Sequence, residues 1–320
     1  MPGEFDLIRD YFTRPSRHTL LGVGDDAALI APAPGMTLAV SADMLVAGTH
    51  FFADTDPADL GWKTLAVNIS DMAAMGAVPR WAFLSLALPA VDEAWIAAFA
   101  GGFFECAQTF DVDLAGGDTT RGPMNFSVTI MGEVPAGGGL LRSGAKPGDD
   151  IWISGTPGRA ALGLRHLQGK LALAAPDVCL AALTRPQPRV ALGLQLRGLA
   201  RAAIDVSDGL LGDLAHILER SAVGAVVEDA CLPLADLSRF TDDITAASEC
   251  LLAGGDDYEL LFCAPSQLRE QIIALSSPAL PLHRIGRITG EPGLHLLDPN
   301  GTPQPLARLG FDHFANSTTP

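Results

Sequence analysis

A Gly- and Pro-rich stretch near the middle of the chain constrains the fold most. Residues 135–149, PAGGGLLRSGAKPGD, lack helical and strand periodicity, whereas the regions on either side alternate strand-length apolar runs with helical patterns. The chain has 320 residues, which is enough for two domains of ordinary size. We therefore predict two domains, residues 1–138 and residues 139–320, joined within this stretch.

Both regions mix helices and strands. In the helix predicted over residues 57–77, Thr64, Asn68 and Asp71 recur at helical spacing, so a rigid element presents an acid on its polar stripe. We predict further helices over residues 4–12, 92–110 and 159–173, a strand–turn–helix unit over 202–221, and strands over 37–43, 81–88, 112–120, 125–134, 150–155, 259–265, 283–289 and 294–298.

The charge balance excludes several classes of partner. The chain has 21 Lys and Arg against 37 Asp and Glu, a net charge of −16, which disfavours nonspecific binding to nucleic acid or anionic membranes. Its five cysteines form no C-x-x-C pair, as expected in a reducing compartment. Without a signal-peptide pattern or an apolar run of membrane-spanning length, we expect a soluble cytoplasmic protein.

Residues 22–27, GVGDDA, match the spacing of the dinucleotide-binding fingerprint. That fingerprint requires a long helix after the glycines, but Pro32 stops any helix within about two turns. Asp25 and Asp26 also stand where a pyrophosphate would approach the backbone. We therefore predict a turn here rather than a dinucleotide loop.

Aspartates beside turn residues recur along the chain. Each one alone is typical of a turn or a helix N-cap, but several lie within apolar stretches, where an unpaired carboxylate is costly. Divalent cations can neutralise such a set, and carboxylate oxygens favour Mg²⁺, which bridges to substrate phosphates. Paired carboxylates for glycoside hydrolysis are the competing chemistry, but they need only two acids. The set comprises Asp25, Asp26, Asp43, Asp71, Asp118, Asp205, Asp208, Asp256 and Asp257.

Motifs containing these acids resemble the thiamine-monophosphate kinase family, which belongs to the aminoimidazole ribonucleotide synthetase-like ATP enzymes. The matching stretches, in chain order, include GVGDDAA, NISDMAAMGAVPRW, GGDTTRGP, AIDVSDGLLGDL and GGDDYEL. The resemblance implies a two-domain α/β and α+β fold. The N-terminal α/β domain binds ATP and Mg²⁺ and dimerises through barrel-forming strands, and the C-terminal α+β domain completes the active-site cleft.

The resemblance also implies the reaction: transfer of the γ-phosphoryl group of ATP to thiamine monophosphate, giving thiamine diphosphate and ADP. The acceptor is a phosphate oxygen that is already anionic near neutral pH, so no acid–base residue is expected. The implied Mg²⁺ ligands are Asp26, Ser41, Asp43, Asp71, Asp118, Asp205 and Asp208; the ATP contacts are Gly117, Asp118, Arg142 and Ser207; the thiamine phosphate contacts are His50, Asp256 and Phe311.

Four positions depart from the family pattern. Ala42 stands where many members have Ser or Thr, which removes a side-chain ligand, and Asp256 shortens the usual Glu. Phe311 replaces Tyr or Trp, and Gly101 replaces an aromatic residue that often contacts the nucleotide. Two alternatives stay open: another ATP-dependent enzyme of this superfamily acting on a phosphorylated metabolite, and a non-catalytic Mg–nucleotide sensor, which could manage with fewer acids.

Overall fold

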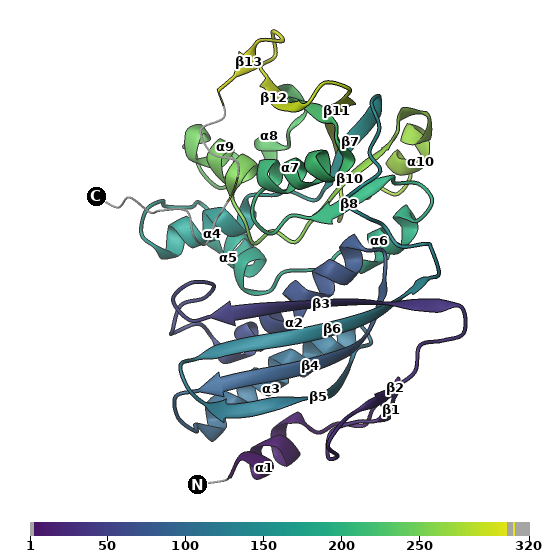
Figure 1. The fold of residues 1–320 in the computed structure, drawn as a ribbon. Helices are drawn as coiled ribbons and strands as arrows, with labels where there is room; N and C mark the ends of the chain where they lie inside the picture. Colours follow the sequence, from purple (N-terminus) through teal and green to yellow (C-terminus); the bar gives the residue numbers. More distant parts are fainter. Residues whose placement is uncertain (1–2, 306–309, 311–320) are drawn as a thin grey trace. The chain divides into compact units, whose positions relative to one another are not determined.

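The structure is a computed structural model that describes residues 3–305 and residue 310. Its chain divides into two compact units, unit 1 (Met1–Gly139) and unit 2 (Leu140–Pro320), each with its own sheet and helices (Figure 1). The functional roles predicted for the two domains stay predictions.

A four-stranded sheet forms the centre of unit 1, and helices α2 (Pro57–Ala74) and α3 (Glu93–Thr109) cover one of its faces (Figure 1). Strands β3 and β4 run antiparallel to β6, and β5 runs parallel to β4. In spatial order the strands are β3 (Met36–Val46), β6 (Asn125–Pro135), β4 (Val78–Leu88) and β5 (Asp113–Arg121). The chain starts with α1 (Glu4–Leu7), a π-helical turn (Ile8–Phe12), and the antiparallel pair β1 (Thr19–Leu21) and β2 (Leu29–Ile30).

The ends of α2 follow from its sequence. The Asp56 carboxylate accepts two backbone N–H groups of the first turn, and Pro57 occupies the first helical position, where its missing N–H costs nothing. The helix ends at Ala74, three residues before the predicted end, because Gly76 adopts a left-handed φ of 59°.

Helices α2 and α3 touch through their backbones. A Cβ atom added at Gly61 would lie 2.0 Å from the carbonyl oxygen of Phe99, and one added at Gly102 would lie 1.8 Å from that of Ala58. Only glycine permits this approach at both positions. The contact fixes α2 against α3, and Leu65 and Ile69 on the apolar face of α2 are fully buried.

Unit 2 is built on a seven-stranded sheet that is antiparallel except for the β9/β12 pair. Adjacent strands bury Ile153, Ile204 and Leu261 in one apolar core. In spatial order the strands are β13 (Pro303–Gln304), β12 (Gly293–Leu297), β9 (Gly224–Glu228), β11 (Leu282–Thr289), β7 (Asp149–Ser154), β10 (Leu260–Pro265) and β8 (Ala202–Asp205).

The helices of unit 2 correct one prediction. Helix α4 (Arg159–Leu167) ends six residues before the expected 173, because Gly169 adopts a left-handed φ of 68°. The strand–turn–helix unit over 202–221 is confirmed as β8 followed by α7 (Leu210–Ser221). The remaining helices were not predicted: α5 (Pro176–Thr184), α6 (Val190–Leu196), α8 (Leu234–Leu237), α9 (Ile244–Ala253) and α10 (Arg269–Ile273).

None of the helices within residues 3–305 combines the length and the apolar character needed to cross a membrane.

Candidate active site

In unit 1 the polar stripe of α2 faces β3. The Ser41 hydroxyl donates to Oδ2 of Asp71 over 2.6 Å, and the backbone N–H of Asp43 donates to Oδ1 of Asn68 over 3.1 Å. The buried Asn68 amide also donates to the carbonyl of Thr64, one turn earlier. The structure therefore brings Ser41, Asp43 and Asp71 together on facing surfaces of one strand and one helix.

Asp26 lies in the exposed turn between β1 and β2. Its backbone N–H donates to Oδ1 of Asp25 over 3.0 Å, and Gly24 adopts a φ of 120°. The chain continues from this turn into a strand, β2, and not into a long helix, which agrees with the rejection of a dinucleotide loop.

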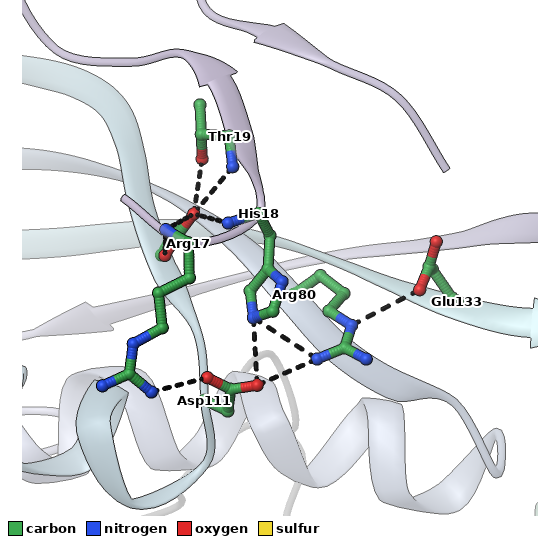
Figure 2. Close-up of polar contacts among 7 residues, drawn as sticks. Arg17, His18, Thr19, Arg80, Asp111 and Glu133 are labelled. Atoms are coloured by element: carbon green, nitrogen blue, oxygen red, sulfur yellow. Dashed lines mark hydrogen bonds and ion pairs between the residues drawn. The ribbon is translucent and has the colours of Figure 1, made fainter. Parts of the chain in front are cut away.

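A polar network fixes the chain just before this turn (Figure 2). The Asp113 carboxylate accepts the backbone N–H groups of Arg17, His18 and Thr19 and the Thr19 hydroxyl. Burial raises the pKa of Asp113, but the hydrogen bonds from these groups lower it more, so its pKa lies below the usual value. Sequence reasoning missed this residue, although an acid inside the apolar run VDLA signals a carboxylate with partners.

Gly117 and Asp118 lie in β5, at the opposite edge of the sheet from β3. Gly117 adopts a φ of 152°, and a Cβ there would lie 1.8 Å from the Leu84 carbonyl, so no other residue fits. Asp118 is exposed and pairs in register with Ser85. Three strand spacings of about 4.8 Å place β5 roughly 14 Å from β3. Within unit 1, therefore, the structure does not bring Asp118 to Asp43.

His50 follows β3 and is held by the backbone. Its Nδ1 accepts the N–H of Val46 over 2.9 Å, which places the proton of the neutral ring on Nε2. Two departures from the family pattern are also in unit 1. Ala42 is exposed in β3, and Gly101 is exposed on α3, where a Cβ would meet no other described atom within 4 Å.

Two predicted site segments of unit 2, residues 206–209 (the first segment) and residues 254–259 (the second segment), are hydrogen-bonded to each other. The N–H of Asp256 donates to the carbonyl of Ser207 over 2.9 Å, and the N–H of Tyr258 donates to that of Val206 over 2.8 Å. Strand β8 ends at Asp205, directly before the first of these segments, and β10 starts directly after the second. The structure therefore groups Asp205, Ser207, Asp208 and Asp256 at one end of the β8/β10 pair.

The buried Asp213 carboxylate organises the first segment. Its Oδ2 accepts the N–H groups of Ser207, Asp208 and Gly209 over 3.0, 3.1 and 3.2 Å. Burial raises the pKa of Asp213 to about 7 even though these N–H donors favour the carboxylate. Sequence reasoning missed this residue too; its signal is an acid four residues after the turn glycine, at the start of a helix.

The second segment has a strained backbone that is held by side-chain hydrogen bonds. Asp256 and Tyr258 adopt left-handed φ angles of 65° and 53°, which are unusual for residues with side chains. The Tyr258 hydroxyl donates to Oδ1 of Asp256 over 3.0 Å. Between them, the half-buried Asp257 accepts the N–H of Gly158 over 2.7 Å, and desolvation of its carboxylate holds its pKa well above the usual value. Strain of this kind persists only where neighbours enforce it, and such positions cluster at binding sites.

Two predicted contacts are less informative. Arg142 is exposed, and its carbonyl accepts the Ser221 hydroxyl over 3.3 Å. Phe311 lies outside the described residues.

The side chains that could bind Mg²⁺ in this structure lie in pairs. Among the described residues, no three His, Cys, Asp or Glu side chains gather closely enough to hold a metal ion by themselves. Mg²⁺ in phosphate-transfer sites needs only one or two carboxylates, with substrate phosphates and water completing its shell. Ser41 with Asp71 supplies such an oxygen pair in unit 1, and Asp205 with Asp208 in unit 2 offers two carboxylates on one short segment.

Comparisons with known proteins identify the family of the chain. Residues 24–134 match the N-terminal domain, and residues 146–298 the C-terminal domain, of AIR synthase related proteins. The chain is 47% identical to the thiamine-monophosphate kinase of Escherichia coli K12, with 98% of each chain covered.

Solved structures give the same result. The thiamine-monophosphate kinase of Stenotrophomonas maltophilia K279a is similar with a TM-score of 0.81 and 50% identity, over 87% of this chain and 91% of that one. A structure described as AaThiL complexed with AMPPCP and TMP is similar with a TM-score of 0.75 and 28% identity, over 91% and 92% of the two chains. The predicted two-domain fold is therefore confirmed, and the chain belongs to the thiamine-monophosphate kinase family of AIR synthase related proteins.

Proposed function

We propose that the protein phosphorylates thiamine monophosphate, using ATP and giving thiamine diphosphate and ADP. The observation that carries this proposal is the 47% identity, along the whole chain, to a thiamine-monophosphate kinase. A related structure whose description names AMPPCP and TMP supports the same pair of substrates. The free cysteine thiols, four of which are buried, suit the cytoplasmic location predicted from the sequence.

Alignment and charge neutralisation account for the chemistry. The attacking oxygen belongs to a phosphate that is largely ionised near neutral pH, so it needs no strong base. When bound, Mg²⁺ neutralises the phosphate charges that the acidic residues would otherwise repel. We assign its ligands to Asp26, Ser41, Asp43, Asp71, Asp118, Asp205 and Asp208.

The other site residues bind and orient the substrates. The segment of Ser207 is fixed by Asp213 and contacts ATP, together with Gly117, Asp118 and Arg142. In the fixed ring of His50, Nε2–H donates to thiamine phosphate. The Asp256 carboxylate pairs with the positive charge of the thiamine group, and Phe311 stacks on its rings.

We also propose that two copies associate through unit 1. On β3, Val40 and Met44 are 57% and 53% exposed, although both side chains are apolar. They alternate with Ser41 and Leu45, which face α2, so they lie on the opposite face of the sheet. A second copy covers this apolar face. Light scattering should give the mass of two chains for the parent protein and of one chain for Val40→Asp/Met44→Asp.

One assay tests the reaction. Incubation with Mg²⁺, ATP and thiamine monophosphate should yield thiamine diphosphate, detected by chromatography. ADP formed only with another phosphorylated metabolite would favour the other superfamily enzymes, and ATP binding without product would favour the sensor.

A matched pair of variants tests the metal ligands. Asp71→Asn keeps the shape of the side chain but weakens its bond to a cation, and we expect at least about a 100-fold loss of activity. Asp59→Asn, on the same helix but near its start, should leave the rate within about twofold. Equal rates for the two variants would contradict the assignment of Asp71.

A further inference from the structure

The turn that carries Asp26 is held at both of its ends by carboxylates from other strands. At the first end, Asp113 of β5 accepts the N–H groups of Arg17, His18 and Thr19 over 2.9, 2.6 and 2.8 Å, and the Thr19 hydroxyl over 2.9 Å. Asp113 is 7% exposed, so water cannot easily replace these donors. Three consecutive residues are therefore fixed directly at the start of β1.

At the second end, Glu133 of β6 accepts the N–H of Ala33, three residues after β2, over 2.6 Å. Arg80 of β4 joins the two anchoring points, because it pairs with Glu133 over 3.3 Å and with Asp111 over 3.0 Å (Figure 2). Asp111 in turn pairs with Arg17 over 3.0 Å. The backbone of the segment from Arg17 to Ala33 is thus attached to β5 at one end and to β6 at the other, while its central turn is exposed.

The same strand that anchors the segment also carries a second acid of the site. Gly22, at the start of the turn, lies against β5, since a Cβ there would be 4.0 Å from the carbonyl of Ala115. Strand β5 continues from Asp113 to Asp118. The position of Asp26 relative to Asp118 therefore depends on the contact between Asp113 and residues 17–19.

We propose that Asp113 is a positioning residue for Mg²⁺ binding: it touches neither ion nor substrate, and it fixes the segment that presents Asp26 beside β5. The proposal rests on the assignment of Asp26 as an Mg²⁺ ligand. Because Mg²⁺ accepts little deviation from ideal ligand geometry, a loosened segment weakens the site even when every ligand is present.

The test compares Asp113→Asn with Asp111→Asn. Asparagine keeps the volume of Asp113 but removes its negative charge, which weakens all four hydrogen bonds. With its oxygen in the Oδ2 position, its NH₂ group takes the Oδ1 position and faces the N–H of Arg17. Asp111 is the matched control: it lies two residues away, its side chain is 45% exposed and accepts from other side chains, and its φ of 56° is one that asparagine tolerates.

The first readout needs no activity. Hydrogen exchange of the amides of residues 17–19 should become at least about tenfold faster in Asp113→Asn and stay within about twofold in Asp111→Asn. The second readout is the Mg²⁺ concentration that half-saturates the reaction. It should rise about 3- to 10-fold in Asp113→Asn, with excess Mg²⁺ restoring most of the activity and the KM for thiamine monophosphate unchanged.

The outcomes separate this proposal from the proposed function. Faster exchange with an unchanged Mg²⁺ requirement would show that the Asp113 contact is structural only and would overturn the proposal, as would unchanged exchange. If Asp26→Asn leaves the Mg²⁺ requirement unchanged, the assignment of Asp26 fails instead. Should Asp113→Asn not fold, Thr19→Val removes one of the four hydrogen bonds, and it should change both readouts in the same direction by a smaller factor.

Discussion

Two aspartate-bearing turns, residues 22–28 in unit 1 and residues 206–209 in unit 2, follow short strands but are held differently. In unit 2, Asp213 accepts the N–H groups of the turn itself and lies only four to six residues further along the chain. In unit 1, Asp113 lies 94 to 96 residues away and accepts N–H groups of the segment before the turn. The turn of unit 2 is therefore formed locally, while that of unit 1 is fixed only at its base and leaves its acids exposed.

This difference predicts that loss of the carboxylate destabilises the fold more at Asp213 in unit 2 than at Asp113 in unit 1. Asp213→Ala leaves three N–H groups without an acceptor in a largely buried setting, and we expect the free energy of unfolding of unit 2 to fall by about 3 kcal/mol. Denaturant titration measures this loss. Asp213→Asn, which keeps one acceptor oxygen, is the control and should lose less than half as much. A larger loss for Asp113→Ala than for Asp213→Ala would break the comparison.

Loss of the hydrogen bond between the Tyr258 hydroxyl and Asp256 in unit 2 should have a smaller effect. Tyr258→Phe removes the hydroxyl that donates to Asp256 and nothing else, so we expect the KM for thiamine monophosphate to rise about fivefold, or about 1 kcal/mol. The KM for ATP should not change. In an Asp256→Asn background, Tyr258→Phe should have less effect. An equal effect in both backgrounds would show that the hydroxyl does not act through Asp256.

Acid should loosen the turn of unit 1 by a still smaller amount. The pKa of Asp113 is lowered in the folded protein, so its stabilising contribution is complete above the usual pKa of 3.8 and is lost as the pH falls through the lower folded value. Pepsin should therefore cut the segment of residues 13–33 faster as the pH falls below 3.8. In Asp113→Asn the cutting rate should be high already and should lack this pH step.

Because Asp213 is buried, its contribution to stability depends on pH in the opposite direction. Its folded pKa is raised to about 7, so its contribution is complete below 3.8 and declines as the pH rises toward 7. Acid therefore acts in opposite directions on the two carboxylates that hold the turns.

Helical spacing predicted that Thr64, Asn68 and Asp71 share one face, and the structure confirms this for Asn68 and Asp71, which both contact β3. The ends of α2 and α4 were predicted too late, because a glycine in the left-handed region stops each helix. Apolar periodicity does not report such a backbone conformation.

The residues that hold the site were harder to find than the acids that form it. Asp113 acts on residues more than ninety positions away, and only the folded sheet shows that contact. Tyr258 reaches Asp256 because both adopt left-handed φ angles, which the sequence GGDDYE does not specify. The separation of Asp118 from Asp43 depends on strand order, which local pattern does not fix. The roles assigned to individual site residues stay predictions.

The backbone contact between Gly61 and α3 has a consequence for remote sequence change. Asp71 lies ten residues, or about 15 Å, along α2 from Gly61. A single added methyl group at Gly61 would have to displace backbone atoms rather than a side chain, so the helix would move as a rigid rod. Asp71 would then move away from the hydroxyl of Ser41, although no residue near Asp71 or Ser41 had been altered. From its sequence alone, such an inactive variant would be taken for a change in the core that does not involve the site.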